Sequence, residues 1–191
     1  MMSPRPYDLT TYDGNRVDWL TRAALERAAE LLGYPLTITQ GSYNAGTVPA
    51  SAGTHDGGGV VDLAPWDHER KVTVLRSVGF AAWFRDSTEG PWPDHIHAVL
   101  IGNERLSRAA ENQVTAYLTG RNGLANNGPD TGTRAYVGRR FTWPEPNRTQ
   151  VGRRRIRRGL RILDQIPAGT RPAVEAARDR IRLILSKMPK A

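Results

Sequence analysis

The chain has no cysteine among its 191 residues and only four histidines. Without thiols it can form neither a disulfide nor a thiolate metal site, so any metal ligands must be His, Asp or Glu. No apolar run approaches the roughly 20 residues of a membrane-spanning helix. Residues 1–9 also lack the apolar stretch of a secretory signal, so we expect cytoplasmic synthesis without a signal peptide.

Acidic residues become scarce toward the carboxyl end. Residues 1–133 hold 11 Lys and Arg against 15 Asp and Glu, a balance of −4, whereas residues 134–191 hold 16 against 4, a balance of +12. Such a basic segment can bind anionic polymer or a membrane surface through charge, or it can be the solvated face of packed helices. We favour association of the 134–191 tail with anionic partners. No groove-reading motif accompanies it, so we expect no sequence-specific nucleic acid binding.

Apolar periodicity predicts an α+β fold, in which a small, mainly antiparallel sheet carries packed helices and precedes a basic helical tail. Helical spacing covers residues 17–32, 67–76 and 107–118. Asn15 is the expected N-cap of the first helix, and Gly33 is its expected stop. Strand patterns cover residues 36–40, 60–63, 80–84 and 95–101. Residues 1–15 are expected to be irregular.

Three of the four histidines lie in two short segments. Residues 51–62 read Ser-Ala-Gly-Thr-His-Asp-Gly-Gly-Gly-Val-Val-Asp, and residues 93–97 read Pro-Asp-His-Ile-His. A catalytic zinc site takes three imidazole or carboxylate ligands and leaves a fourth position open. Asp62, His55 and one or both of His95 and His97 form such a set, because the glycines at 57–59 allow the chain between them to turn.

The pattern His-x-x-Gly-x-x-x-Asp, followed by Asp-His-x-His, resembles a group of zinc metallopeptidases. The group contains D-alanyl-D-alanine carboxypeptidases, D-Ala-D-Ala dipeptidases, L-alanyl-D-glutamate phage endolysins and the hedgehog signalling domain, with a zinc site of the lysostaphin type. The resemblance covers roughly residues 36–100. It implies Zn²⁺ held by His55, Asp62 and His97, with Asp94 as the general base and His95 as a stabiliser of the transition state.

The resemblance implies a hydrolase that cleaves peptidoglycan stem peptides, as a DD- or LD-carboxypeptidase or endopeptidase of endolysin type that acts at the cell wall if released. Residues 1–120 would then be the metallopeptidase-like domain, residues 121–150 a linker and residues 151–191 the basic helical tail of a monomer. The candidate substrate-binding residues are Gln40, Ser42, Tyr43, Asn44 and Trp92.

Asn44 stands where the family carries an arginine that helps to hold the substrate. This departure favours an alternative, a non-catalytic zinc-containing module of the same fold that binds the cell wall or a partner. An iron(II) oxygenase is a third hypothesis, because two His and one carboxylate also form the facial triad of those enzymes. A nucleic-acid protein built on the basic tail is the fourth.

Overall fold

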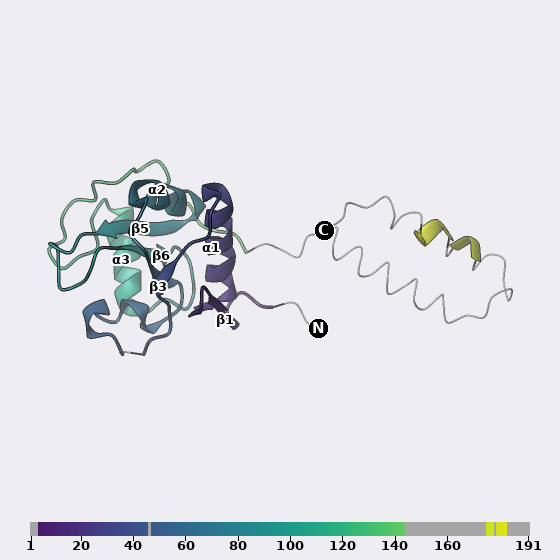
Figure 1. The fold of residues 1–191 in the computed structure, drawn as a ribbon, viewed down its shortest axis with the longest axis horizontal. Coiled ribbons are helices and arrows are strands. Elements are labelled where there is room, and N and C mark those ends of the chain that lie inside the picture. Colours follow the sequence, from purple (N-terminus) through teal and green to yellow (C-terminus); the bar gives the residue numbers. More distant parts are fainter. Residues whose placement is uncertain (1–3, 46, 144–174, 178, 183–191) are drawn as a thin grey trace. The chain divides into compact units, whose positions relative to one another are not determined.

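The structure, a computed structural model, describes residues 4–45, 47–143, 175–177 and 179–182. The chain divides into two compact units, Met1–Trp143 and Pro144–Ala191 (Figure 1). In the second unit, the described residues 175–177 and 179–182 are helical, and the rest of the predicted tail lies outside the described residues. None of the helices in the described part of the chain has the length and hydrophobicity that a membrane span requires.

The first unit combines two antiparallel sheets with helices, which confirms the predicted α+β class. In chain order its elements are β1 (Leu9–Tyr12), β2 (Asn15–Asp18), α1 (Trp19–Leu32), β3 (Ile38–Gln40), the 3₁₀ turns η1 (Pro49–Ser51) and η2 (Thr54–Asp56), β4 (Val60–Leu63), α2 (His68–Val78), β5 (Phe80–Arg85), β6 (His95–Leu100) and α3 (Arg108–Leu118). Strands β1 and β2 form a hairpin, and the other strands form an antiparallel sheet of order β3-β4-β6-β5.

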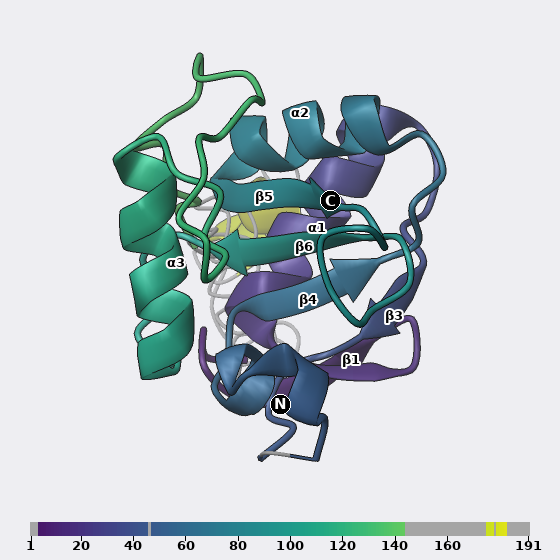
Figure 2. The same cartoon turned by 90° about the vertical axis from the view of Figure 1, so that its left-hand side faces the viewer.

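Strand β6 shows how the sheet separates two faces. Side chains alternate along a strand, and Ile96, Ala98 and Leu100 belong to the core beneath α1 and α2. Val99 faces the other way, into a smaller core with Ala110 and Tyr117 of α3. In Figure 2, α1 lies behind the sheet and α3 lies at one side of it. His95 and His97 share the parity of Val99, so they point toward the face that carries α3.

The helix ends follow capping chemistry, with one correction to the sequence analysis. The N-cap of α1 is Asp18, whose Oδ1 accepts the Thr21 amide N–H at 2.7 Å, and the predicted cap Asn15 is wrong. Asn15 instead lies in β2, because residues 9–18 form a hairpin where irregular chain was expected. Gly33 ends α1 in the left-handed conformation, as predicted.

Residues 121–143, which fall in the predicted linker or irregular segment, are irregular in structure and contact the helices of the first unit. The buried Arg76 guanidinium of α2 donates to the Thr133 carbonyl oxygen at 2.7 Å and to Asp130 Oδ1 at 2.9 Å. Arg134 Nη1 donates to the Tyr117 carbonyl oxygen at 2.6 Å. These contacts hold the segment that begins at residue 121 against α2 and α3.

Candidate metal centre

His55, Asp62 and His97 come from three separate elements, η2, β4 and β6. Asp62 and His97 are direct cross-strand partners, which places their side chains on one face of the sheet. The chain after η2 passes close to the backbone of Arg105 before it enters β4. This path places the His55 ring beside Asp62. A Cβ at position 57 would lie 2.2 Å from the Arg105 carbonyl oxygen, so only glycine fits there.

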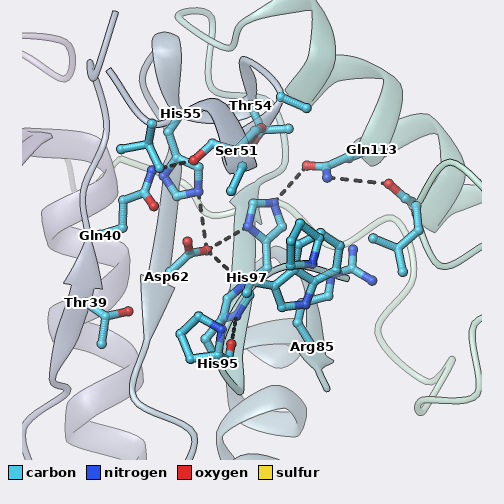
Figure 3. A pocket seen from close by; sticks show the side chains of 18 of the residues that line it. Thr39, Gln40, Ser51, Thr54, His55, Asp62, Arg85, His95, His97 and Gln113 are labelled. Atoms are coloured by element: carbon cyan, nitrogen blue, oxygen red, sulfur yellow. Dashed lines mark hydrogen bonds and ion pairs between the residues drawn. The ribbon is translucent and has the colours of Figure 1, made fainter. Parts of the chain in front are cut away.

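One carboxylate oxygen lies between the two imidazoles (Figure 3). Asp62 Oδ1 is 3.3 Å from His55 Nε2 and 2.7 Å from His97 Nδ1. The ligand atoms that the three residues offer all lie within 4.8 Å of one another, and all three residues are buried. Ligands of one tetrahedral ion with bonds of about 2.0–2.1 Å are roughly 3.4 Å apart. The cluster can therefore hold a metal ion.

The outer nitrogen of each imidazole faces an oxygen that accepts hydrogen bonds. His55 Nδ1 is 2.8 Å from the Gly41 carbonyl oxygen, and His97 Nε2 is 2.8 Å from Gln113 Oε1. The Gln113 amide nitrogen lies 3.5 Å from the Gly123 carbonyl oxygen, a long contact that is consistent with the amide oxygen facing His97. Metal-binding histidines commonly donate their outer N–H to such partners, which leaves the inner lone pair for the ion.

The contacts of this cluster need more protons than neutral imidazoles carry. Four contacts each join a ring nitrogen of His55 or His97 to an oxygen that only accepts, two on Asp62, one on Gly41 and one on Gln113. Two neutral imidazoles provide two N–H groups. If the outer contacts take both of them, the inner lone pairs of the two rings and one carboxylate oxygen face the same point, an arrangement that suits a cation.

Burial and the neighbouring imidazoles both act on the charges of the cluster. Burial lowers the pKa of His97, which favours the neutral ring over an imidazolium. Burial by itself would raise the pKa of Asp62, but the facing imidazoles of His55 and His97 outweigh it and hold that pKa below its ordinary value. The site at neutral pH is therefore an anionic carboxylate flanked by neutral His97, which is the protonation state that a metal ligand needs.

A pocket of about 440 Å³ opens over the cluster. Its walls come from the segment around η1 and η2, from the β5–β6 connection and from the start of the 121–143 segment. The sequence-predicted residues that line it, besides the three candidate ligands, are Gln40, Trp92, Asp94 and His95. Apolar residues make up much of the remaining wall, namely Val48, Ala50, Ala52, Pro91, Pro93, Leu124 and Ala125.

His95 and Asp94 lie at the edge of the cluster. His95 Nδ1 donates to the Pro93 carbonyl oxygen at 2.7 Å, which leaves Nε2 3.8 Å from Asp62 Oδ1. Asp94 is exposed and comes immediately before β6, and its Oδ1 accepts the Ser87 amide N–H at 2.8 Å. Both side chains line the pocket, Asp94 from the turn that precedes β6 and His95 from the first position of the strand.

Three predicted substrate-binding residues do not line the pocket. The hydroxyl of Ser42 is buried and donates to the Val60 carbonyl oxygen at 2.6 Å. The Tyr43 hydroxyl donates to Asp18 Oδ2 at 3.0 Å, and the Asn44 amide donates to the Gly41 carbonyl oxygen at 3.2 Å. These contacts hold the loop that carries the Gly41 carbonyl, so the three side chains serve the shape of the site.

Two residues of the site were missed by the sequence analysis, Gln113 and Arg85. Gln113 shares a helix face with Ala110 and Tyr117, which are buried, so a polar residue in that stripe was a usable signal. Arg85 ends a strand whose other residues are largely buried, and it is 3% exposed. A charged residue buried at the end of a strand is a functional candidate.

No protein-family model, curated protein or solved structure matches this chain.

Proposed function

We propose that the protein is a zinc-dependent hydrolase that cleaves peptide bonds of peptidoglycan stem peptides. The observation that carries the proposal is the convergence of His55, Asp62 and His97, which are all buried and whose ligand atoms lie within 4.8 Å of one another. Two His and one carboxylate suit Zn²⁺, so His55, Asp62 and His97 would hold the ion as a catalytic site does, with three protein ligands. Zinc bound there supplies Lewis-acid polarisation of a carbonyl and lowers the pKa of water.

The chain's own residues then divide the work of hydrolysis. Asp94 takes a proton from the attacking water and delivers it to the amine as the C–N bond breaks, which is general base and then general acid catalysis. His95 lines the pocket with Nε2 3.8 Å from Asp62 Oδ1, and in its protonated form it donates from Nε2 to the carbonyl oxygen, where negative charge develops. The Ala-rich and Pro-rich wall suits a substrate with small apolar side chains such as alanine.

The test is hydrolysis of purified peptidoglycan, measured as the release of new amino groups with and without a chelator. We expect release that stops on chelation and returns with added Zn²⁺. Asp94→Asn should keep one bound zinc and lose at least about 100-fold in rate, the usual contribution of a general base. Mass spectrometry of the fragments identifies the bond, which distinguishes DD- from LD-cleavage and carboxypeptidase from endopeptidase activity.

A second candidate is a zinc-containing module that binds the wall or a partner without turnover. The observation in its favour is that the Asn44 amide, at the position of the family arginine, is engaged with Gly41 and lies outside the pocket lining. A protein that holds one zinc, sediments with cell walls and releases no amino groups would be this module. Bound iron in protein produced without added metal would instead favour the oxygenase hypothesis.

We further propose that the protein acts at the cell wall after release from the cytoplasm, as lysins do. The +12 balance of residues 134–191 favours association with an anionic wall polymer or lipid surface. We expect the catalytic unit to act as a monomer.

A further inference from the structure

Arg85 is a buried cation without an anionic partner. The residue is 3% exposed, and within the described part of the chain no carboxylate oxygen lies within ion-pair distance of its guanidinium. Among the described residues, its guanidinium makes one hydrogen bond, from Nη2 to the Asn122 carbonyl oxygen at 2.7 Å. The guanidinium also lies over the Trp83 ring, 4.8 Å from the centroid. A guanidinium has five N–H groups, so most of them have no acceptor in the protein.

The unpaired N–H groups face the pocket. Arg85 lines the pocket, and none of its nitrogens is among the fully enclosed side-chain atoms that lack a hydrogen-bond partner. Its cross-strand partner is His95, and the neighbouring pair on the same sheet face is Trp83 and His97. The guanidinium is therefore in the row of side chains next to the candidate metal ligands, as Figure 3 shows.

Burying an unpaired charge is costly, so a protein that keeps one uses it for binding or catalysis. Burial lowers the pKa of Arg85 to about 10, which still leaves it charged at neutral pH. The planar fork of Arg matches a carboxylate, with two parallel hydrogen bonds. A cation of this kind beside a peptidase centre suits an anionic group close to the scissile bond.

We propose that Arg85 binds a carboxylate of the substrate and thereby selects peptides that carry one next to the bond to be cut. The residue is a specificity determinant on β5, remote in sequence from Asn44. The inference rests on the proposed peptidase function for its substrate class. The carboxylate has two sources in such peptides, the free carboxyl end of the chain and the carboxyl group of a glutamate residue.

The experiment compares matched peptides. One pair differs only in a free or amidated C-terminus, and the other pair differs only in a free or amidated glutamate carboxyl. We expect the wild-type full-length protein to prefer one acid over its amide by at least 10-fold in kcat/KM, and the preferred pair identifies the source. Arg85→Met should abolish the preference by raising KM for the acid alone, and Arg85→Lys should restore part of it. The exposed Arg108→Met is the control and should retain the preference.

Several outcomes overturn the proposal. They are equal hydrolysis of acid and amide by the wild type, a preference that survives in Arg85→Met, and a fall in kcat that is equal for acid and amide. Thermal unfolding of each variant checks that it is folded, and the acid-amide comparison on the wild type needs no variant at all.

A binding measurement separates this proposal from the proposed function. Titration of N-acetyl-D-alanine and its amide, followed by NMR, requires no turnover. Binding of the acid but not the amide, lost in Arg85→Met, supports the carboxylate site even if no peptide is hydrolysed. Equal binding of both compounds, or binding of the acid that persists in Arg85→Met, contradicts it even if peptides are cleaved.

Discussion

At the scale of single residues, Gln113 determines which nitrogen of His97 carries the proton. Its amide oxygen faces His97 Nε2 at 2.8 Å, so the neutral ring is protonated there and presents the Nδ1 lone pair to the cluster. The long contact to the Gly123 carbonyl oxygen is consistent with this orientation of the amide. Gln113 thus positions a metal ligand without touching the ion.

This role predicts unequal effects of two substitutions. Gln113→Leu removes the acceptor and should weaken Zn²⁺ binding about 10- to 100-fold, the usual effect of losing an outer partner of a histidine ligand. Gln113→Glu keeps an acceptor and should bind zinc at least as well as the wild type. Competition with a chromophoric chelator measures both constants. Asn112→Leu, an exposed neighbour on α3, is the matched control, and equal losses in the control and Gln113→Leu would contradict the assignment.

The ligand set itself is tested by two histidine variants. His97→Ala should no longer bind one zinc ion per chain. One of the three ligands is gone, and Asp62 loses an imidazole that favours its ionised form. His68→Ala should keep one zinc per chain, since His68 stacks on Phe84 away from the cluster. Elemental analysis of the purified variants gives the result. Retention of zinc by His97→Ala at the wild-type level would place the metal elsewhere.

At the scale of elements, periodicity was enough to find the strands of the main sheet and the three helices. Val60–Leu63 and His95–Leu100 are short and flanked by turn residues, and both form strands close to the predicted bounds. The β1–β2 hairpin was missed because its strands have four residues each and little apolar character. The signal present was the Asp13-Gly14 pair, whose positive φ angles of 49° and 76° suit a two-residue hairpin turn.

The site was less predictable than the sheet, for a physical reason. His55, Asp62 and His97 belong to a spaced pattern, and the structure brings those three together. Gln113 and Arg85 reach the site only through the packing of α3 and the pairing of β5 with β6, and no local spacing encodes that contact. Ser42 was expected in the pocket because loops with Ser and Gly often bind ligands, but its hydroxyl is bonded to both the amide and the carbonyl of Val60.

Arg76 of α2 and Asp130 form a buried ion pair that helps to hold the segment following α3, and Asp130 Oδ2 also accepts from Arg134 at 3.1 Å. The Arg76 and Asp130 side chains are 1% and 2% exposed. Asp130→Ala leaves the Arg76 guanidinium without its counter-ion and should lower the free energy of unfolding by about 3–5 kcal/mol, as expected for a broken buried pair. Urea unfolding measures the change. Glu111→Ala removes the exposed partner of Arg108 and should change stability by less than about 1 kcal/mol, so similar losses in both variants would contradict the argument.

At the scale of the whole molecule, the metal ion should contribute to folding of the first unit. Its ligands join η2, β4 and β6, which are separated by up to 42 residues of chain. A ligand that binds only the folded state stabilises it by RT ln(1 + [L]/Kd), about 4 kcal/mol at a free concentration 1,000 times Kd. Chelation should therefore lower Tm, and added Zn²⁺ should restore it. In His97→Ala the same additions should leave Tm unchanged, and a metal-dependent shift in that variant would contradict the assigned ligands.

The basic carboxyl end leads to a separate expectation about where the protein acts, and residues 144–191, the second unit, hold 13 Lys and Arg against 4 Asp and Glu, a balance of +9. The +12 balance of residues 134–191 predicts retention on anionic cell-wall material that weakens as salt rises, because ions screen the attraction. We expect full-length protein to sediment with walls at low salt and to be released by several hundred millimolar NaCl. A chain ending at Trp143, the boundary of the first unit, should lose most of this retention yet hydrolyse small soluble peptides at the full-length rate. Small soluble peptides do not present the charged polymer, so their hydrolysis should not need the tail. A truncated chain that loses both wall retention and peptide hydrolysis would show that the tail contributes to the first unit itself. Retention that does not change with salt would show that the tail binds by something other than charge.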